Sequence, residues 1–139
     1  MIAYPAKFKN AAEGGYVVEF IDIPSCITEG DTLEEAKTMA KEAISAMLYS
    51  LDSRRMVIPE PSTIRGRGIY YIEPELKIAF AITLKKERER LGLSQKDVAE
   101  RLNVNWTYYQ RIENPRKTNP TLSTIEKLQK VFNRRFLSL

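Results

Sequence analysis

The sequence predicts an α+β protein in which an antiparallel sheet with one packed helix is followed by an all-α region. Three observations support this prediction. Apolar and polar residues alternate in the first part of the chain, as they do in half-buried strands. Apolar residues then recur with a helical period over residues 32–53 and again over residues 84–132. Proline-containing stretches at residues 58–62 and 73–74 separate these regions.

Four strands are predicted in the N-terminal part of the chain. Residues 1–9 alternate, but Pro5 cannot donate a ladder hydrogen bond, so we expect this strand to lie at an edge or to start late. Residues 16–21 and 26–28 follow turn signals and complete a three-stranded antiparallel meander. Residues 69–72, with the sequence Ile-Tyr-Tyr-Ile, predict a fourth strand that could return beside the first three.

One long helix is predicted between the third and fourth strands. Thr32 and Glu35 have the spacing of a capping box, and small or apolar residues then recur with a period near 3.6 as far as residues 52–53. This stripe allows the helix to lie on the sheet. A second helix is predicted to start at residues 73–74, because proline suits the first helical turn. Its apolar face is predicted to consist of Leu76, Phe80, Leu84 and Leu91.

The charge of the chain is divided unevenly along its length. Residues 1–63 carry 6 Lys and Arg against 10 Asp and Glu, a net charge of −4, whereas residues 64–139 carry 16 against 8, a net charge of +8. The basic part favours a polyanion such as nucleic acid, and the acidic part favours a basic protein. Together with the prolines, this division predicts two domains, residues 1–72 and residues 73–139.

Composition excludes several kinds of active site. The chain has 139 residues, of which 43% are hydrophobic and 29% charged, the balance of a folded globular protein. It has no histidine and one cysteine, Cys26, which excludes Ser-His-Asp and Cys-His catalysis, histidine-ligated zinc and an internal disulfide bond. No apolar run approaches 18 residues, and no signal-peptide pattern is present. We therefore expect a cytoplasmic protein with no membrane association, no cofactor and no metal site.

Residues 94–112 have the spacing of a DNA-binding helix-turn-helix. Ser94 is predicted to cap its first helix and Asn105 its second. Ala99 has to be small because the second helix crosses over it, and Asn103 stands where the turn needs a left-handed backbone. The apolar residues predicted to anchor the two helices are Val98, Leu102, Val104, Tyr109 and Ile112.

The second helix of this motif supplies the predicted base contacts. Gln110 suits adenine, Arg111 suits guanine or a phosphate, and the Thr107 methyl group suits thymine, although each could instead be a solvated surface residue. The predicted DNA-binding residues, including phosphate contacts and nearby cations, are Gln95, Lys96, Trp106, Thr107, Tyr108, Gln110, Arg111, Arg116 and Lys117. Because one reading helix contacts few base pairs, we expect a homodimer or a higher even-numbered oligomer.

The chain resembles two known families. Residues 85–95 and 111–122 resemble the opening and the close of Xre/Cro-type repressor domains. The N-terminal stretch Tyr-Pro-Ala-Lys-Phe at residues 4–8, the motif around Gly14-Gly15-Tyr16, and Ile-Pro-Glu-Pro-Ser at residues 58–62 resemble HicB-family antitoxins. With the helix-turn-helix region, this resemblance covers nearly the whole chain. The sequence departs from the family pattern in detail, since Ile21 and Ser25 stand where the family often has proline and glycine.

The resemblance to HicB proteins implies a partial RNase H-like fold joined to a DNA-binding domain. It implies that the N-terminal domain binds and neutralises HicA, a small basic toxin that cleaves mRNA, and that the C-terminal domain represses the shared operon. Acidic residues of the N-terminal domain would steer a basic toxin. The residues expected to contact the toxin are Glu13, Glu19, Asp22, Glu29 and Asp31.

Two alternatives remain open from the sequence. An RNase H-like sheet can carry a catalytic metal on clustered carboxylates, to which Asp22 and Asp31 could contribute. Turn and capping roles explain these two residues, no compact acidic trio is visible, and Cys26 is expected to be a small buried residue, so we predict no catalytic residue and no enzyme. The other alternative is a stand-alone repressor with a ligand-sensing N-terminal domain, which the absence of a neighbouring gene for a small basic protein would favour.

Overall fold

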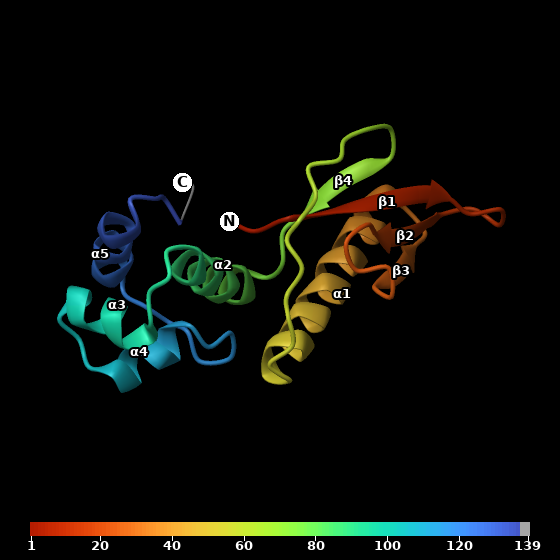
Figure 1. Cartoon of the computed structure of the whole chain (residues 1–139). Coiled ribbons are helices and arrows are strands. Elements are labelled where there is room, and N and C mark those ends of the chain that lie inside the picture. The colour runs from red at the N-terminus through yellow and green to blue at the C-terminus, as the bar shows by residue number, and fades with distance from the viewer. Residues whose placement is uncertain (137–139) are drawn as a thin grey trace. The chain divides into compact units, whose positions relative to one another are not determined.

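The computed structural model describes residues 1–136 (Figure 1). The elements in chain order are β1 (Tyr4–Asn10), β2 (Tyr16–Phe20), β3 (Ile27–Gly30), α1 (Leu33–Ser53), β4 (Ile69–Ile72), α2 (Leu76–Arg90), α3 (Gln95–Leu102), α4 (Trp106–Ile112) and α5 (Leu122–Phe132). This order confirms the predicted α+β class. The chain forms two compact units: an N-terminal unit, Ile2–Leu76, and a C-terminal unit, which comprises Met1 and the residues from Lys77 onward. The last residues of the predicted second domain, 137–139, lie outside the described residues.

The N-terminal unit is a four-stranded antiparallel sheet in the order β3-β2-β1-β4, with α1 packed along one face (Figure 1). The predicted meander and the fourth strand are confirmed. The prediction of an edge position for the first strand is wrong, because β1 lies between β2 and β4, although it does start late, at Tyr4. Pro5 is tolerated there because it lies opposite Ile21, which follows the last residue of β2. The Pro5 carbonyl accepts the Ile21 N–H at 3.1 Å. The missing N–H of Pro5 therefore removes no hydrogen bond from the β1–β2 ladder.

The core of the N-terminal unit lies between the sheet and α1. Tyr4, Ala6 and Phe8 alternate inward from β1, and Val18 and Phe20 do so from β2. The facing stripe of α1 is fully buried and consists of Ala36, Ala40, Ile44 and Leu48. Small residues at the start of this stripe bring the helix close to the sheet.

The start of α1 is determined by two local features. The Thr32 side chain accepts a hydrogen bond from the Glu35 N–H at 3.1 Å, which confirms the predicted cap. Gly30, the last residue of β3, has no space for a side chain, since a Cβ atom would lie 2.4 Å from the backbone nitrogen of Ala36. The chain can therefore pass from the edge strand into the helix within two residues.

The C-terminal unit is a bundle formed by α2 to α5. Its core residues are Phe80, Leu84, Val98, Ala99, Leu102, Tyr109, Ile112, Leu128, Phe132 and Phe136. The predicted apolar face of α2 is therefore correct at Phe80 and Leu84 but wrong at Leu76 and Leu91, which are 61% and 42% exposed. The reason is the extent of the helix: Leu76 is its first residue, later than the predicted start, and Leu91 follows its last residue.

Candidate nucleic-acid interface

The predicted helix-turn-helix is formed by α3, a turn at residues 103–105, and α4. The Ser94 hydroxyl accepts the Asp97 N–H at 3.0 Å, and the Ser94 N–H donates to the Asp97 carboxylate at 2.8 Å, which together make a capping box. Asn103 adopts the left-handed conformation, with φ 57° and ψ 45°, as predicted. Asn105 caps α4 by accepting the Tyr108 N–H at 2.7 Å. Local residues thus determine where both helices begin and where they turn.

The crossing of the two helices agrees with the role predicted for Ala99. This residue is 3% exposed, and its carbonyl accepts the Val104 N–H at 3.0 Å, so the turn folds directly back onto α3. Tyr109 and Ile112 anchor α4 and are 0% and 2% exposed. A larger side chain at position 99 would separate the helices and tilt α4.

The opposite side of α4 carries the side chains that were predicted to read bases. Thr107, Gln110 and Arg111 are all exposed, whereas Tyr109 and Ile112 between and after them are buried. This is the arrangement that a reading helix needs, because its hydrogen-bonding groups must project into the major groove.

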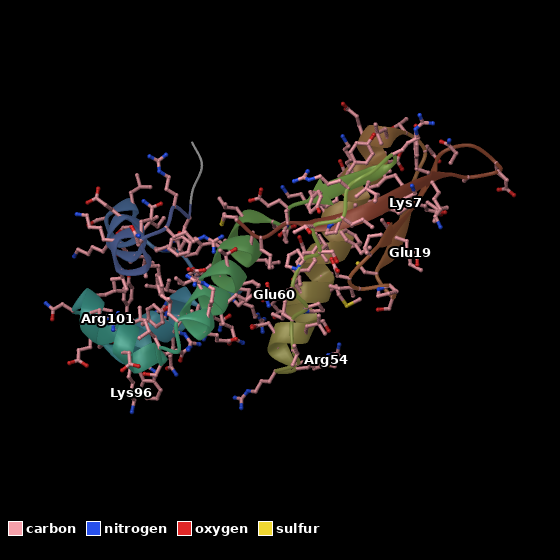
Figure 2. All side chains as sticks on the ribbon, turned by 45° about the horizontal axis from the view of Figure 1, so that its top comes forward. Lys7, Glu19, Arg54, Glu60, Lys96 and Arg101 are labelled. Carbon is pink, nitrogen blue, oxygen red and sulfur yellow. The ribbon has the colours of Figure 1, made fainter. Side chains whose placement is uncertain are left out.

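The structure brings together two other predicted DNA-binding residues. The Lys96 ammonium group lies 4.6 Å from the centre of the Trp106 ring, a cation–π contact that joins the beginnings of α3 and α4. Lys96 is exposed, as Figure 2 shows, and Trp106 remains 44% exposed. The two side chains form a surface platform beside the exposed residues of α4.

The remaining predicted residues are placed less uniformly. Arg116 and Lys117 are exposed in the turn after α4, where the Asn114 side chain accepts the Arg116 N–H at 3.0 Å. Tyr108 is partly buried and packs against the hydrophobic core. Gln95 is half-buried, and its side-chain amide donates to Glu113 at 3.2 Å. These last two side chains therefore make contacts inside the unit that the sequence did not predict.

A buried ion pair beneath the motif was missed by the sequence reasoning. Arg88 of α2 donates from Nε and Nη2 to the two carboxylate oxygens of Glu113, at 2.6 and 3.0 Å, and from Nη1 to the Leu93 carbonyl at 2.8 Å. The Glu113 side chain is 2% exposed and that of Arg88 13%. Such bidentate pairing is geometrically specific, so it orients α2, the loop before α3, and the end of α4.

Burial and the ion pair shift two pKa values in this part of the unit. Burial opposes the charge of Arg88, but the hydrogen bonds and charge of Glu113 outweigh it and raise the pKa of Arg88 above its ordinary value. Burial, followed by the nearby Glu113 carboxylate, raises the pKa of the Tyr109 hydroxyl. Arg88 therefore stays charged and Tyr109 stays neutral at physiological pH. Charged residues are frequent throughout this sequence, so no local signal distinguished Arg88 and Glu113 as buried.

A second buried carboxylate, on α2, is hydrogen-bonded to the segment that follows α5. Glu87 is 6% exposed and accepts hydrogen bonds from Arg90 and, at 2.8 Å, from Arg134. The hydrogen bond from Arg90 and the pairing with Arg134 hold the pKa of Glu87 below its usual value, although burial opposes this. Glu87 therefore remains charged at neutral pH.

The acidic residues predicted to contact a toxin lie at several places on the N-terminal unit. Glu13, Glu29 and Asp31 are exposed and line one depression beside the β1–β2 turn. Glu19 lies opposite Lys7 in the register of β1 and β2. Both residues, labelled in Figure 2, alternate with the buried residues of their strands and so lie on the face of the sheet that α1 does not cover. Asp22 differs from these four: its carboxylate accepts both the backbone N–H of Ser62, at 2.9 Å, and the Ser62 hydroxyl.

The contacts of Asp22 belong to a network that holds the long connection between α1 and β4 on the sheet. The Tyr4 hydroxyl donates to the Pro59 carbonyl at 2.6 Å. The Tyr71 hydroxyl lies 3.0 Å from the Ser62 carbonyl and 2.7 Å from the Ile64 carbonyl. Asp22 therefore has a structural role besides the contact predicted for it.

The part of the chain that the structure describes gives no positive support to a catalytic site. Within residues 1–136, no three or more Cys, Asp or Glu side chains are grouped so that they could hold a metal ion. Cys26 is buried as predicted, and burial raises the pKa of its thiol to about 11, which disfavours the nucleophilic thiolate. In the same part of the chain, no helix combines the length and hydropathy that a bilayer crossing requires.

Comparisons with known proteins agree with this division of the chain. A family model described as "HicB_like antitoxin of bacterial toxin-antitoxin system" matches residues 3–77, and a model described as "Helix-turn-helix" matches residues 84–139. The chain is 32% identical to Antitoxin HicB of Escherichia coli (strain K12) over 99 residues, which are 71% of this chain and 71% of that protein. It is 36% identical to Antitoxin HicB 2 of Photorhabdus laumondii over 110 residues, 78% of this chain and 76% of that protein.

These matches cover both units that the structure separates. Antitoxin and helix-turn-helix families are generally non-enzymatic. The chain therefore belongs to the HicB-like antitoxin family of bacterial toxin–antitoxin systems and carries a DNA-binding helix-turn-helix domain in its C-terminal unit.

Proposed function

We propose that the N-terminal unit binds and neutralises a small basic, HicA-like toxin that cleaves mRNA, and that the C-terminal unit represses the operon encoding both proteins. The observation that carries the proposal is the opposite charge of the two units. Residues 2–76 carry 8 Lys and Arg against 12 Asp and Glu, a net charge of −4, and residues 77–139 carry 14 against 6, a net charge of +8. An acidic surface attracts a basic partner and a basic surface attracts DNA, so the two tasks belong to different units.

On the DNA side, α4 enters the major groove and Gln110, Arg111 and Thr107 contact base edges. The phosphate contacts come from residues around this helix, namely Gln95, Lys96, Trp106, Arg116 and Lys117. Tyr108 has a smaller role, since its ring is partly committed to the core. A single reading helix covers a few base pairs, so the protein binds paired half-sites as a homodimer or a higher even-numbered oligomer.

On the toxin side, Glu13, Glu29 and Asp31 form one acidic contact region and Glu19 a second on the open face of the sheet. Asp22 acts by holding the Ser62 segment in place. Binding occludes the basic, RNA-binding surface of the toxin without any chemistry by the antitoxin. The protein is not an enzyme and acts in the cytoplasm, where both mRNA and the operon are accessible.

The test is to co-express the full chain with the protein encoded by the neighbouring reading frame. We expect a stable complex in which RNA cleavage by the neighbour is abolished, and we expect the complex or the free chain to bind the DNA upstream of its own gene. A chain that binds this DNA but has no small basic neighbour, and no effect on RNA cleavage, would instead be a stand-alone repressor. Metal-dependent RNA cleavage by the chain itself, lost on Asp22→Ala, would support the nuclease alternative.

A further inference from the structure

The sheet of the N-terminal unit is divided into a cationic and an anionic half. Residues 1–12 and 61–72, which contain β1, β4 and the turn before β4, hold no aspartate or glutamate. The carboxylates on the strands belong instead to β2 and β3. The residues 1–12 and 61–72 hold four of the eight Lys and Arg of this unit, although its net charge is −4. These four residues form the cationic corner of the sheet: Lys7, Lys9, Arg65 and Arg67.

The turn that carries the two arginines is bound to β1. The Gly68 carbonyl accepts the Phe8 N–H at 2.7 Å, and the Arg67 carbonyl accepts the Lys7 ammonium group at 2.6 Å. Gly68 has φ 76° and no space for a side chain, since a Cβ atom would lie 2.9 Å from the Phe8 carbonyl oxygen. Lys7 and the turn are therefore fixed against each other, and this preorganisation lowers the cost of gathering their charges around an anion.

A stacked pair of side chains lies beside this turn. The guanidinium carbon of Arg65 lies 5.4 Å from the centre of the Tyr71 ring. The ring is 36% exposed, and its hydroxyl is hydrogen-bonded to two carbonyls of the connection before β4, which holds it in place. Tyr71 lies opposite Pro5 in the register of β1 and β4, so it faces the same side of the sheet as Lys7 and Lys9.

These features fit a polyanion that carries flat groups. Four like charges on strands without carboxylates repel a basic protein and attract phosphates. A nucleic-acid base can stack on an aromatic ring or on a guanidinium plane, and Arg65 with Tyr71 offers both. A duplex keeps its bases stacked inside, so only unpaired bases can reach a ring on the face of a sheet. An acidic peptide would use the charges but would leave the ring without a partner.

We propose that the cationic corner and Tyr71 bind a single strand of nucleic acid, with its phosphates on the four cations and one base on the Arg65–Tyr71 pair. Glu19 limits this site, because it lies opposite Lys7 on β2. The strand therefore follows β1 and β4 and does not cross the sheet. Single-stranded RNA and DNA share this chemistry. The binding requires neither the toxin nor operator DNA, so its failure would leave the proposed function untouched.

The experiment measures binding of the full chain to a fluorescein-labelled 12-nucleotide uridylate by fluorescence anisotropy. Arg65→Ala with Arg67→Ala is compared with Lys41→Ala with Arg54→Ala, a matched control that removes the same charge from exposed positions on or just after α1. The first variant should bind about 20-fold more weakly at about 0.1 M salt, and its dependence of log affinity on log salt should be shallower by about 1.4. The control should stay within about twofold, because distant charges are screened.

The stacking contact is tested separately. Tyr71→Leu removes the aromatic face, whereas Tyr71→Phe keeps it and removes only the hydroxyl. We expect the leucine variant to bind about tenfold more weakly and the phenylalanine variant to stay within about twofold. Equal losses in the two variants would show that the hydroxyl acts through the fold, and would contradict stacking.

A further measurement uses the unchanged chain and so does not depend on any variant being folded. Ultraviolet crosslinking of the uridylate, followed by mass spectrometry, should identify Tyr71. Crosslinks confined to the C-terminal unit would overturn the proposal, as would an uridylate affinity that is the same for the arginine variant and its control.

Other probes distinguish the remaining partners. A 12-nucleotide thymidylate that shows the same dependence on Arg65 and Arg67 would extend the site to single-stranded DNA. A 12-base-pair duplex that loses as much affinity as the uridylate in the arginine variant would overturn the preference for unpaired bases. Displacement of the uridylate by polyglutamate of equal charge, in an amount that depends on Arg65 and Arg67, would identify an acidic protein as the partner and overturn the proposal.

Discussion

The two units place their charged side chains in different ways. In the C-terminal unit two carboxylates, Glu87 and Glu113, are buried and paired with arginines. In the described part of the N-terminal unit, by contrast, Ser45 is the buried polar residue and every carboxylate is at least partly exposed. The sheet obtains its geometry from backbone ladders, which fix the register of each strand. Short helices lack such ladders between them, so buried ion pairs supply the orientation that a DNA-reading surface needs.

The largest expected effect tests the ion pair directly. Glu113→Ala leaves Arg88 buried without its partner, which should cost about 3–5 kcal/mol of the free energy of unfolding of the C-terminal unit. Hydrogen exchange should become faster at the amides of α3 and α4 and stay unchanged in the β1–β2 ladder. A loss below about 1 kcal/mol would mean that the pair does not stabilise this unit, and the contrast between the units would disappear.

The next effect concerns the exposed face of α4. Combined Gln110→Ala and Arg111→Ala should weaken binding to the DNA upstream of the gene by at least about 2 kcal/mol, because each base contact is worth about 1–3 kcal/mol. Fluorescence anisotropy at several salt concentrations measures this loss, and circular dichroism checks that the exposed substitutions leave the fold intact. Unchanged affinity would remove the assignment of α4 as the reading helix.

A smaller effect is expected in the N-terminal unit. Asp22→Ala removes the acceptor of two hydrogen bonds from Ser62, and since the site is only half-buried we expect a loss of about 1–2 kcal/mol in the free energy of unfolding. Glu13→Ala is the control, since Glu13 is exposed and should stay within about 0.5 kcal/mol. Both are measured by chemical denaturation followed on N-terminal amides. Equal effects of the two variants would show that Asp22 does not hold the connection.

The smallest effect is a dependence on pH of the stability of the C-terminal unit. The pKa of Glu87 is lowered by Arg90 and Arg134, so its stabilising contribution is present above the pKa of an unfolded glutamate and is lost as pH falls through the lower, folded value. Thermal unfolding between pH 7 and pH 3 should show a steeper loss of Tm for the unchanged chain than for Glu87→Gln. If Tm falls equally with pH in the two proteins, the stabilising role of ionised Glu87 is contradicted.

Much of the candidate DNA site could be predicted because its determinants are local. The caps at Ser94 and Asn105, the left-handed Asn103 and the small Ala99 lie within one short stretch, and helical spacing then decides which side chains face outward. For the acidic residues of the N-terminal unit, the sequence predicted toxin contacts for the whole set and did not distinguish one residue from another. Their division into an exposed set and the bound Asp22 depends on Ser62, which is 40 residues away in the chain.

The sequence by itself determined the elements, the helix-turn-helix and the charge of each unit, because strand alternation, helical period and capping depend on residues that are near one another in the chain. Only the tertiary structure decided that β1 lies inside the sheet and that Gln95, Arg88 and Glu113 meet at one buried point. Arg88 and Glu113 are 25 residues apart, and nothing local distinguishes them from the other charged residues. The burial and pairing of Arg88 and Glu113 depend on how whole helices pack. This packing creates the low-dielectric interior in which a charged side chain requires a partner.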